Sequence, residues 1–415
     1  MSSIEKKDNS RIVFISDSYP PSIDATSALN ADIIEKISER NEITLILPSE
    51  LRETLTKKTS LFKREGNKYT RLLPIPFAKT KSKGLKIIKF LAYAGGCWAY
   101  VMLKRHPRNT YIIHSSPPIN IPLFAILIAC RNLVSRKRRR SIAYIHDLYP
   151  DIVQELTKTN AMLRLIYRVT KRIYSISYNS FDAVITCSES ISKVINKNYD
   201  VPKRNIITIW NWSLTESVEV KEVPIRSREK GGRNPIYCIG NFGILHMPED
   251  SIDLLSTIAK NTDQKINLYL RGTHARRLNS RFKEQKNNVR ICKYMTLEEL
   301  KHTYLTENPI TFVSLNRKSS LYAFPSRIAT AISLGSPIIF FSDDHEQNPI
   351  SRIICREKIG VCLKKTESSA EIEKKILEVK INYKEYSLRC IEYYKAIMCK
   401  EKNIEKITSL IKSLE

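Results

Sequence analysis

The chain has 415 residues, of which 42% are hydrophobic and 27% charged, and its formal net charge is +27. This composition excludes a disordered chain, and the length predicts two domains. The nine cysteines include no CxxC pair and no histidine at metal spacing, so a reducing cytosol is expected, without a zinc site or a disulfide framework. The first residues lack the apolar core of a signal peptide, and the longest apolar run, 90–103, is shorter than the roughly 20 residues that cross a bilayer.

Most of the positive charge lies in one segment. Residues 57–140 contain 20 Lys and Arg against one acid, Glu65. Such a segment attracts nucleic acid or an anionic membrane surface. No nucleic-acid-binding signature is present, and the apolar stretch carries the aromatic residues of an interfacial helix, namely Phe90, Tyr93, Trp98 and Tyr100. The sequence therefore favours a membrane surface, with a core helix as the alternative.

The first half of the chain alternates between strands and helices. A buried strand at 11–16 precedes a proline-containing loop, a helix that Thr26 or Ser27 would cap, and a strand at 42–47. This unit places the first loop at the carboxyl edge of a parallel sheet, where doubly wound folds bind ligands. Further strands are predicted at 111–114, 142–146, 183–187 and 206–209, and helices at 122–133 and after Ser188.

The second half repeats this alternation. Residues 213–234 lack periodicity and predict a linker, and 371–414 predict helices whose tyrosines (383, 386, 393 and 394) pack them back across the molecule. Strands are predicted at 235–239, 266–270, 289–292, 310–315 and 337–341. We expect an α/β fold of two doubly wound, Rossmann-like domains facing across a cleft that holds a nucleotide. The expected domains are 1–212 and 235–380, followed by C-terminal helices at 381–415.

The stretch 322–341 contains a helix start, a helix stop and a buried strand. Pro325 suits a first helical turn, Ser326 can satisfy an early backbone N–H, and Gly335 ends the helix. A helix that begins at a sheet edge offers N–H groups and partial positive charge to a phosphate, and Arg327 adds a full charge. An ordinary strand–helix unit with a solvated arginine is the alternative.

Seven short motifs, in order along the chain, resemble those of the GT-B glycosyltransferases of retaining family four. They are YPPSIDAT at 19–26, SPP at 116–118, HDLYPD at 146–151, IWNW at 209–212, GNFG at 240–243, NVR at 288–290 and FPSR at 324–327. The resemblance is to the branch that builds bacterial O-antigen, capsule and exopolysaccharide. It implies an acceptor-side first domain, a second domain that binds a nucleotide sugar, and a saccharide acceptor that is lipid-linked.

The basic segment 57–140 and its aromatic apolar stretch predict a cytoplasmic enzyme that is peripheral on the inner face of the cytoplasmic membrane, where lipid-linked acceptors would be met. The expected roles include lipopolysaccharide and other surface polysaccharide synthesis. No cofactor is expected apart from the nucleotide-sugar co-substrate, because cations and oriented N–H groups can stabilise a diphosphate leaving group without a metal.

The expected site residues fall into three groups. Donor contacts are expected from the second domain, at Asn241, Gly243, Arg271, Ser326, Arg327 and Thr330. His146 and Asp147, at a strand end, are the candidates for deprotonating the acceptor. Asp24 and Thr26 are expected to orient sugar hydroxyls. The structural alternatives are a packed histidine at 146, a surface arginine at 271 and a helix cap at 26.

The chain departs from the family pattern at several positions. Relatives carry two glutamates separated by seven residues, where this chain has Tyr322 and Thr330, and an Arg/Lys pair where Asn241 and His246 stand. The missing carboxylates leave two alternatives to a transferase. One is a catalytically degenerate GT-B protein that only binds a nucleotide sugar, and the other is a GT-B sugar-nucleotide epimerase.

Overall fold

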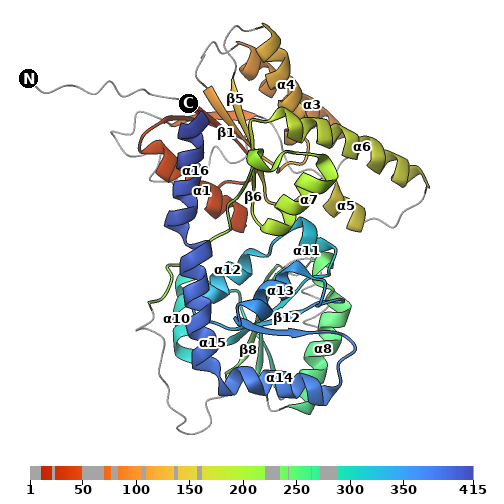
Figure 1. Ribbon diagram of the computed structural model, residues 1–415, viewed down its shortest axis with the longest axis vertical. Coiled ribbons are helices and arrows are strands. Elements are labelled where there is room, and N and C mark those ends of the chain that lie inside the picture. The colour runs from red at the N-terminus through yellow and green to blue at the C-terminus, as the bar shows by residue number, and fades with distance from the viewer. Residues whose placement is uncertain are drawn as a thin grey trace, which may run out of the picture. The chain divides into compact units, whose positions relative to one another are not determined.

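The chain forms two compact units. The computed structural model describes residues 11–20, 24–48, 70–75, 83–103, 109–134, 139–156, 161–219, 234–241, 243–262, 264–271, 282 and 288–414. Unit 1 comprises Met1–Gln154, Lys158–Ile209 and Asn403–Glu415, and unit 2 comprises Glu155–Thr157 and Trp210–Lys402 (Figure 1). The last helix therefore returns to unit 1.

Unit 1 is built on a seven-stranded parallel sheet with the order β3-β2-β1-β4-β5-β6-β7. Its strands are β1 (Arg11–Ile15), β2 (Glu42–Pro48), β3 (Thr70–Ile75), β4 (Asn109–His114), β5 (Arg140–Ile145), β6 (Ala183–Thr186) and β7 (Ile206–Thr208). Its helices are α1 (Ala25–Ser38), α3 (Lys83–Leu103), α4 (Asn120–Val134), α5 (Asp151–Leu156), α6 (Ala161–Ser180), α7 (Glu189–Tyr199) and α16 (Lys400–Leu414), with a 3₁₀ turn at Lys203–Asn205. The strand order reverses between β1 and β4, and doubly wound sheets bind ligands at such a point.

Unit 2 contains a six-stranded parallel sheet with the order β10-β9-β8-β11-β12-β13. Its strands are β8 (Ile236–Asn241), β9 (Ile266–Arg271), β10 (Val289–Ile291), β11 (Ile310–Ser314), β12 (Ile338–Phe341) and β13 (Gly360–Leu363). Its helices are α8 (Pro248–Asn261), α10 (Leu297–Glu307), α11 (Ser319–Tyr322), α12 (Ser326–Ser333), α13 (Pro349–Arg356), α14 (Ser369–Ile381) and α15 (Tyr383–Tyr393), with a 3₁₀ turn at Ile244–His246 and a π-helical turn at Tyr394–Met398. Here the order reverses between β8 and β11.

These sheets confirm the predicted α/β class. Every strand expected from the sequence is present, with its ends shifted by no more than two residues. The reason is that the strands are continuous apolar runs; all of β4 and all of β12 are buried, for example. β3 and β13 were not predicted; each lies at an edge of its sheet.

Helix α3 is partly a core helix. Tyr93, Cys97 and Val101 are buried at four-residue spacing, whereas Trp98 is 53% exposed. The interpretation of Tyr93 as an interfacial aromatic is wrong, because its hydroxyl is buried and donates to Oδ1 of Asn120 at 2.6 Å. The side chain of Phe90 lies outside the described residues.

Two predicted helix caps are wrong. α1 is capped by Asp24 rather than by Thr26 or Ser27, because the Asp24 carboxylate accepts from the backbone N–H of Ser27 at 2.8 Å and from its hydroxyl at 2.7 Å. At α12 the N-cap is Pro325, which has no side-chain donor or acceptor, and Ser326 is the first helical residue. Ser326 therefore does not cap the helix.

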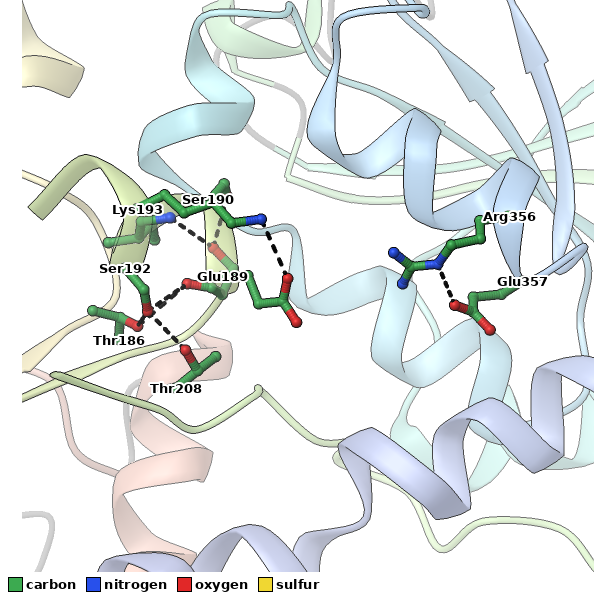
Figure 2. A network of polar contacts seen from close by, with 10 residues as sticks. Thr186, Glu189, Ser190, Ser192, Lys193, Thr208, Arg356 and Glu357 are labelled. Atoms are coloured by element: carbon green, nitrogen blue, oxygen red, sulfur yellow. Dashed lines mark hydrogen bonds and ion pairs between the residues drawn. The ribbon is translucent and has the colours of Figure 1, made fainter. Parts of the chain in front are cut away.

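Helix α7 begins as predicted at Ser188, whose hydroxyl accepts from the N–H of Ile191. Figure 2 shows the polar network beside this start. The Ser192 hydroxyl lies 2.6 Å from that of Thr186 and 2.7 Å from that of Thr208, so it joins the helix to β6 and β7. These hydrogen bonds fix the carboxyl ends of two neighbouring strands.

The first part of the expected linker packs on unit 2. Val218 is buried, and its N–H donates to the carbonyl of Ser333 at 3.0 Å. Residues 220–233 of the predicted linker lie outside the described residues, whereas its last residue, Asn234, is described.

Candidate functional site

In unit 2 the carboxyl edge of the sheet, where β8 and β11 end, holds the side chain of Arg327. A Cβ built on Gly240, in β8, would lie 3.5 Å from Cζ of Arg327, so the guanidinium rests on the glycine backbone. Gly240 also has a φ of +108°, which L side chains rarely adopt. The glycine thus allows both this backbone conformation and the close approach of the guanidinium.

Arg327 is held in place by His246. Its guanidinium donates to Nε2 of His246 at 3.0 Å, while Nδ1 of the same ring lies 2.5 Å from the carbonyl oxygen of Ser314. Because a carbonyl only accepts, Nδ1 carries the proton and Nε2 is free to accept. The backbone of His246 is also held, because its carbonyl oxygen accepts hydrogen bonds from the hydroxyls of Ser314 and Ser251.

His246 stays neutral. Burial, and then the charge of Arg327, lower the pKa of His246 to about 3, although the contact with Ser314 opposes the shift. A neutral imidazole positions the guanidinium without cancelling its charge. Burial also lowers the pKa of Arg327, but arginine remains protonated in proteins. The result is a preorganised, half-buried cation at the point where the strand order reverses.

Arg271, at the end of β9, is a second cation in unit 2. Its Cζ lies 3.5 Å from the centroid of the Tyr294 ring, in a cation–π contact. Tyr294 is 41% exposed, so this pair lies at the surface rather than in the core. Arg271 is therefore stacked in one orientation, and differs from a freely solvated arginine.

The other predicted donor residues are placed as follows. A Cβ on Gly243 would meet no described heavy atom within 4 Å, so there is open space beside this glycine. Ser326 and Thr330 are half-buried and one helical turn apart on α12, and Tyr322 ends α11. Asn241 ends β8, and its side chain lies outside the described residues.

In unit 1 two histidines meet at the ends of β4 and β5. The rings of His114 and His146 have centroids 4.9 Å apart, and Tyr144 lies against both. Nδ1 of His114 accepts from the N–H of Ser116 at 3.0 Å, which leaves its proton on Nε2. Within the described residues Nε2 of each histidine is buried without a hydrogen-bond partner. An oxygen of a ligand would suit the N–H of His114.

Both histidines are neutral at physiological pH. Burial lowers the pKa of His114 to about 4, and burial together with the neighbouring His114 lowers the pKa of His146 well below its usual value. His146 is therefore a weak base. Its position is set by packing on Tyr144 and by its backbone, since its N–H donates to the Ser115 hydroxyl at 3.3 Å.

Asp147, the next residue, differs from His146 in its ionisation. Burial raises the pKa of the Asp147 carboxyl from 3.8 to about 6. A carboxylate with a pKa near the working pH is a better proton acceptor than an ordinary aspartate. Burial thus shifts the pKa values of the two predicted bases in opposite directions, and the role of each stays a prediction.

Asp24 is already engaged. Besides capping α1, its carboxylate accepts from the hydroxyl of Ser18 at 2.5 Å. Thr26 is half-buried in the first turn of α1. Their predicted role in orienting sugar hydroxyls stays a prediction.

Asp151, the last residue of the HDLYPD motif, has a structural role. Its carboxylate accepts from the hydroxyl of Tyr167 at 2.9 Å and from that of Tyr199. The Tyr199 ring packs edge-on against Tyr178, so the carboxylate anchors a tyrosine cluster under α6 and α7.

Sequence reasoning named His246 only as a departure from the family pattern, and it missed His114 and Tyr294. His114 ends a predicted strand and is followed by the SPP motif, so its position was available from the sequence. The contacts of His246 and Tyr294 depend on residues 81 and 23 positions away, respectively, and no local pattern indicates them.

Residues 68–212 match the sequence profile of Glycosyltransferase Family 4. No curated protein sequence matches the chain significantly. The match covers much of unit 1, including β4, β5, the two histidines and Asp147.

Solved structures similar to this chain have the GT-B fold. HepE of Anabaena, solved in complex with UDP, has a TM-score of 0.65 at 12% identity, over 97% of this chain and 100% of its own. Sucrose-phosphate synthase of Thermosynechococcus elongatus has a TM-score of 0.66 at 12% identity, over 98% of this chain and 99% of its own. The lipopolysaccharide outer core galactosyltransferase WaaB has a TM-score of 0.60 at 11% identity, over 98% of this chain and 100% of its own. The chain is thus an α/β protein of the GT-B class.

Proposed function

We propose that this protein is a glycosyltransferase that moves a sugar from a nucleotide-sugar donor to a saccharide acceptor. The observation that carries the proposal is the Arg327 guanidinium, positioned on Gly240 by neutral His246 where the unit 2 sheet reverses its order. Breaking a glycosidic bond to a diphosphate leaves negative charge on that group, and a preorganised cation stabilises it. The family match and the GT-B fold support the same activity.

The donor is assigned to unit 2. Arg327 and the first N–H groups of α12, at Ser326 onward, would bind the diphosphate, and Gly243 leaves room for it. Because HepE was solved with UDP, a uridine diphosphate sugar is the first candidate. With these cations at the site, we propose that transfer requires no metal.

The acceptor is assigned to unit 1. Asp147 would accept the proton of the attacking hydroxyl, and the buried N–H of His114 would hold an acceptor oxygen. We propose retention of the anomeric configuration from the resemblance to family four. Tyr322 and Thr330 stand where relatives have glutamates, so this chain's mechanism must proceed without those carboxylates.

Helix α6 supports a lipid-linked acceptor. Its exposed side carries apolar residues at spacings of three and four, which form one stripe along the helix: Met162, Leu165, Ile166, Val169, Ile173 and Ile176. The opposite side packs against α4 and α7 through Tyr174 and Tyr178. Exposed Trp98 and Leu103 of α3, and Ile126 and Leu133 of α4, extend the apolar surface of unit 1.

The charge of this surface selects an anionic bilayer as its partner. Residues 161–180 contain Arg164, Arg168, Lys171 and Arg172 and no acid. An apolar stripe with flanking cations is the pattern of a helix that lies in a membrane interface. A second copy of this chain would bring another net charge of +27, and is disfavoured by repulsion.

In the predicted basic run at 136–140, the side chain of Arg139 is turned into unit 1. Arg139 is buried, and its guanidinium donates to the carbonyl of Val101 and to the hydroxyl of Tyr111. Residues 136–138 lie outside the described residues. Within the described residues no helix is both long enough and apolar enough to span a bilayer. We therefore propose peripheral attachment through α6, at the inner face of the cytoplasmic membrane, in synthesis of O-antigen, capsule or a related lipopolysaccharide.

Replacing Ile166 and Ile173 together by serine should weaken binding to anionic vesicles roughly a hundredfold, because each buried isoleucine contributes about 1.5 kcal/mol or more. The two residues are 49% and 44% exposed, so folding should be little affected. Leu377→Ser, on exposed α14 of unit 2, is the matched control. Vesicle sedimentation is the measurement. Unchanged binding of the double variant, or equal binding to neutral vesicles at all salt concentrations, would contradict this attachment.

A thermal-shift screen of nucleotide sugars tests the activity itself. A true donor at 100 times its dissociation constant should stabilise the fold by about 2.7 kcal/mol. Transfer is then measured with that donor. Binding without transfer to any saccharide or lipid-linked acceptor would indicate the degenerate GT-B protein, and interconversion of the nucleotide sugar without an acceptor would indicate an epimerase.

A further inference from the structure

Two cysteines of unit 2 lie in contact. Cys355 is in the last turn of α13 and Cys362 is in β13, and their sulfur atoms are 3.3 Å apart. Both are free thiols. Cys355 is exposed and Cys362 is buried, so a reagent in solution reaches one sulfur first and the second lies directly behind it.

Rigid elements hold both sulfurs. A Cβ on Gly360 would lie 2.0 Å from the carbonyl oxygen of Ile338, so β13 is pressed against β12 and cannot shift. The thiol of Cys362 also contacts the carbonyl of Ser351, one turn before Cys355 on α13, at 3.6 Å. The approach of the two sulfurs is therefore built into the packing of helix and strand.

The surroundings of Cys355 favour its thiolate. The hydrogen bond with Cys362 lowers the pKa of Cys355; burial opposes this shift, and the charge of Lys375 adds to it. Lys375 is fixed by its hydrogen bonds to the carbonyl of Cys362 at 2.9 Å and to Glu367 at 2.8 Å. The adjacent Arg356 is paired with Glu357 at 2.6 Å (Figure 2). Cys355, the exposed thiol of the pair, is thus the nucleophile, and Cys362 is the second thiol behind it.

Both cysteines line one pocket of about 440 Å³. Its wall also includes Lys358, Lys375, Arg389, Glu378 and Glu385, together with Tyr386. Lys375 is paired with Glu367 and Arg389 with Glu385, so Lys358 is the cation that could bind a carboxylate of a small peptide thiol. The pocket is large enough for a tripeptide-sized reagent to approach Cys355.

We propose that Cys355 and Cys362 form a thiol-modification site that reacts with a low-molecular-weight disulfide of the glutathione class and closes to an intramolecular disulfide. The Cys355 thiolate attacks one sulfur of the reagent, which breaks the S–S bond and releases one small thiol. Cys362 then gives up its proton and attacks the Cys355 sulfur, releasing the second small thiol. The two cysteines lose two electrons, and the reagent gains them as two thiols.

Glutathione disulfide, added to the full-length protein at neutral pH, is the test. Intact-mass measurement should show the loss of two hydrogens, and peptide mapping should join the peptides of Cys355 and Cys362. Cys355→Ser should remove this cross-link. Cys362→Ser should instead accumulate a glutathione adduct on Cys355, because no second thiol is present to release it. Both variants should keep the circular dichroism spectrum of the parent.

Cys130, an exposed cysteine on α4, is the internal control. Cys355 should react faster than Cys130, since the charge of Lys375 and the contact with Cys362 favour its thiolate. A lasting glutathione adduct on Cys355 in the parent, or reaction of Cys355 no faster than that of Cys130, would overturn the proposal.

Discussion

Replacing Arg327 by alanine should lower kcat/KM for sugar transfer by roughly ten- to hundredfold. A hydrogen bond to a charged group contributes about 1.5–3 kcal/mol, and the loss appears in the rate when the contact strengthens in the transition state. The guanidinium is already oriented by His246, so no reorganisation accompanies the development of charge on the leaving diphosphate. Initial rates at low and at saturating donor provide the measurement.

Three further variants separate charge from position. Arg327→Lys keeps the charge but loses the planar fork that donates to His246, and should recover only part of the rate. Ser326→Ala should leave stability unchanged, because Pro325 and not Ser326 stands at the N-cap. Arg352→Ala, an exposed arginine on α13, is the control and should transfer like the parent. If Arg327→Ala also matches the parent at both donor concentrations, the cation has no part in transfer.

Replacing Asp147 by asparagine should lower kcat by about 10²–10⁴, the usual contribution of a positioned general base. Burial raises the pKa of Asp147 to about 6, and the base must be ionised. The parent's rate should therefore rise with pH, reach half its maximum at about pH 6 and level off about one pH unit higher. His146→Gln should not move this midpoint, because the pKa of His146 lies well below its usual value. A rate profile of Asp147→Asn that matches the parent in height and midpoint would exclude the role.

Stability should depend on pH in the opposite sense to activity. The folded pKa of Asp147 lies above its unfolded value of 3.8, so the folded state favours the protonated form. The stability that Asp147 contributes is complete below pH 3.8 and is lost as pH rises through about 6. Asp147→Asn should therefore be as stable as the parent, or more stable, at pH 8 in urea denaturation. Lower activity with equal or higher stability separates a catalytic role from a structural one.

The fold could be predicted from the sequence because its strands are continuous apolar runs with polar loops at their ends. Residues 338–341 and 142–145 are examples, since their burial is dictated by composition alone. β3 and β13 were missed: β3 contains Thr70, Arg71 and Pro74, and β13 is a run of only four residues, Gly360–Leu363. Helix caps were also missed at Asp24 and Pro325, since several adjacent residues at each helix start are acceptable first residues.

A candidate site residue could be predicted only where its position follows from the local sequence, such as the end of a strand or the start of a helix. Arg327, His146 and Asp147 follow buried strands or begin a helix, so their location could be read locally. The partners that give them their chemistry come from distant segments: His246 for Arg327, and His114 for His146. Ionisation likewise depends on burial, which explains why Asp147 and His146, adjacent in sequence, have pKa values shifted in opposite directions.

The central claim is that a cation in unit 2 holds the diphosphate of the donor. Calorimetric titration of UDP into the full-length parent, Arg327→Ala and Asp147→Asn tests it most directly. We expect Arg327→Ala to weaken the dissociation constant by roughly ten- to hundredfold, and Asp147→Asn, in the acceptor unit, to leave it unchanged. Undiminished binding by Arg327→Ala, or an equal loss in Asp147→Asn, would contradict the account.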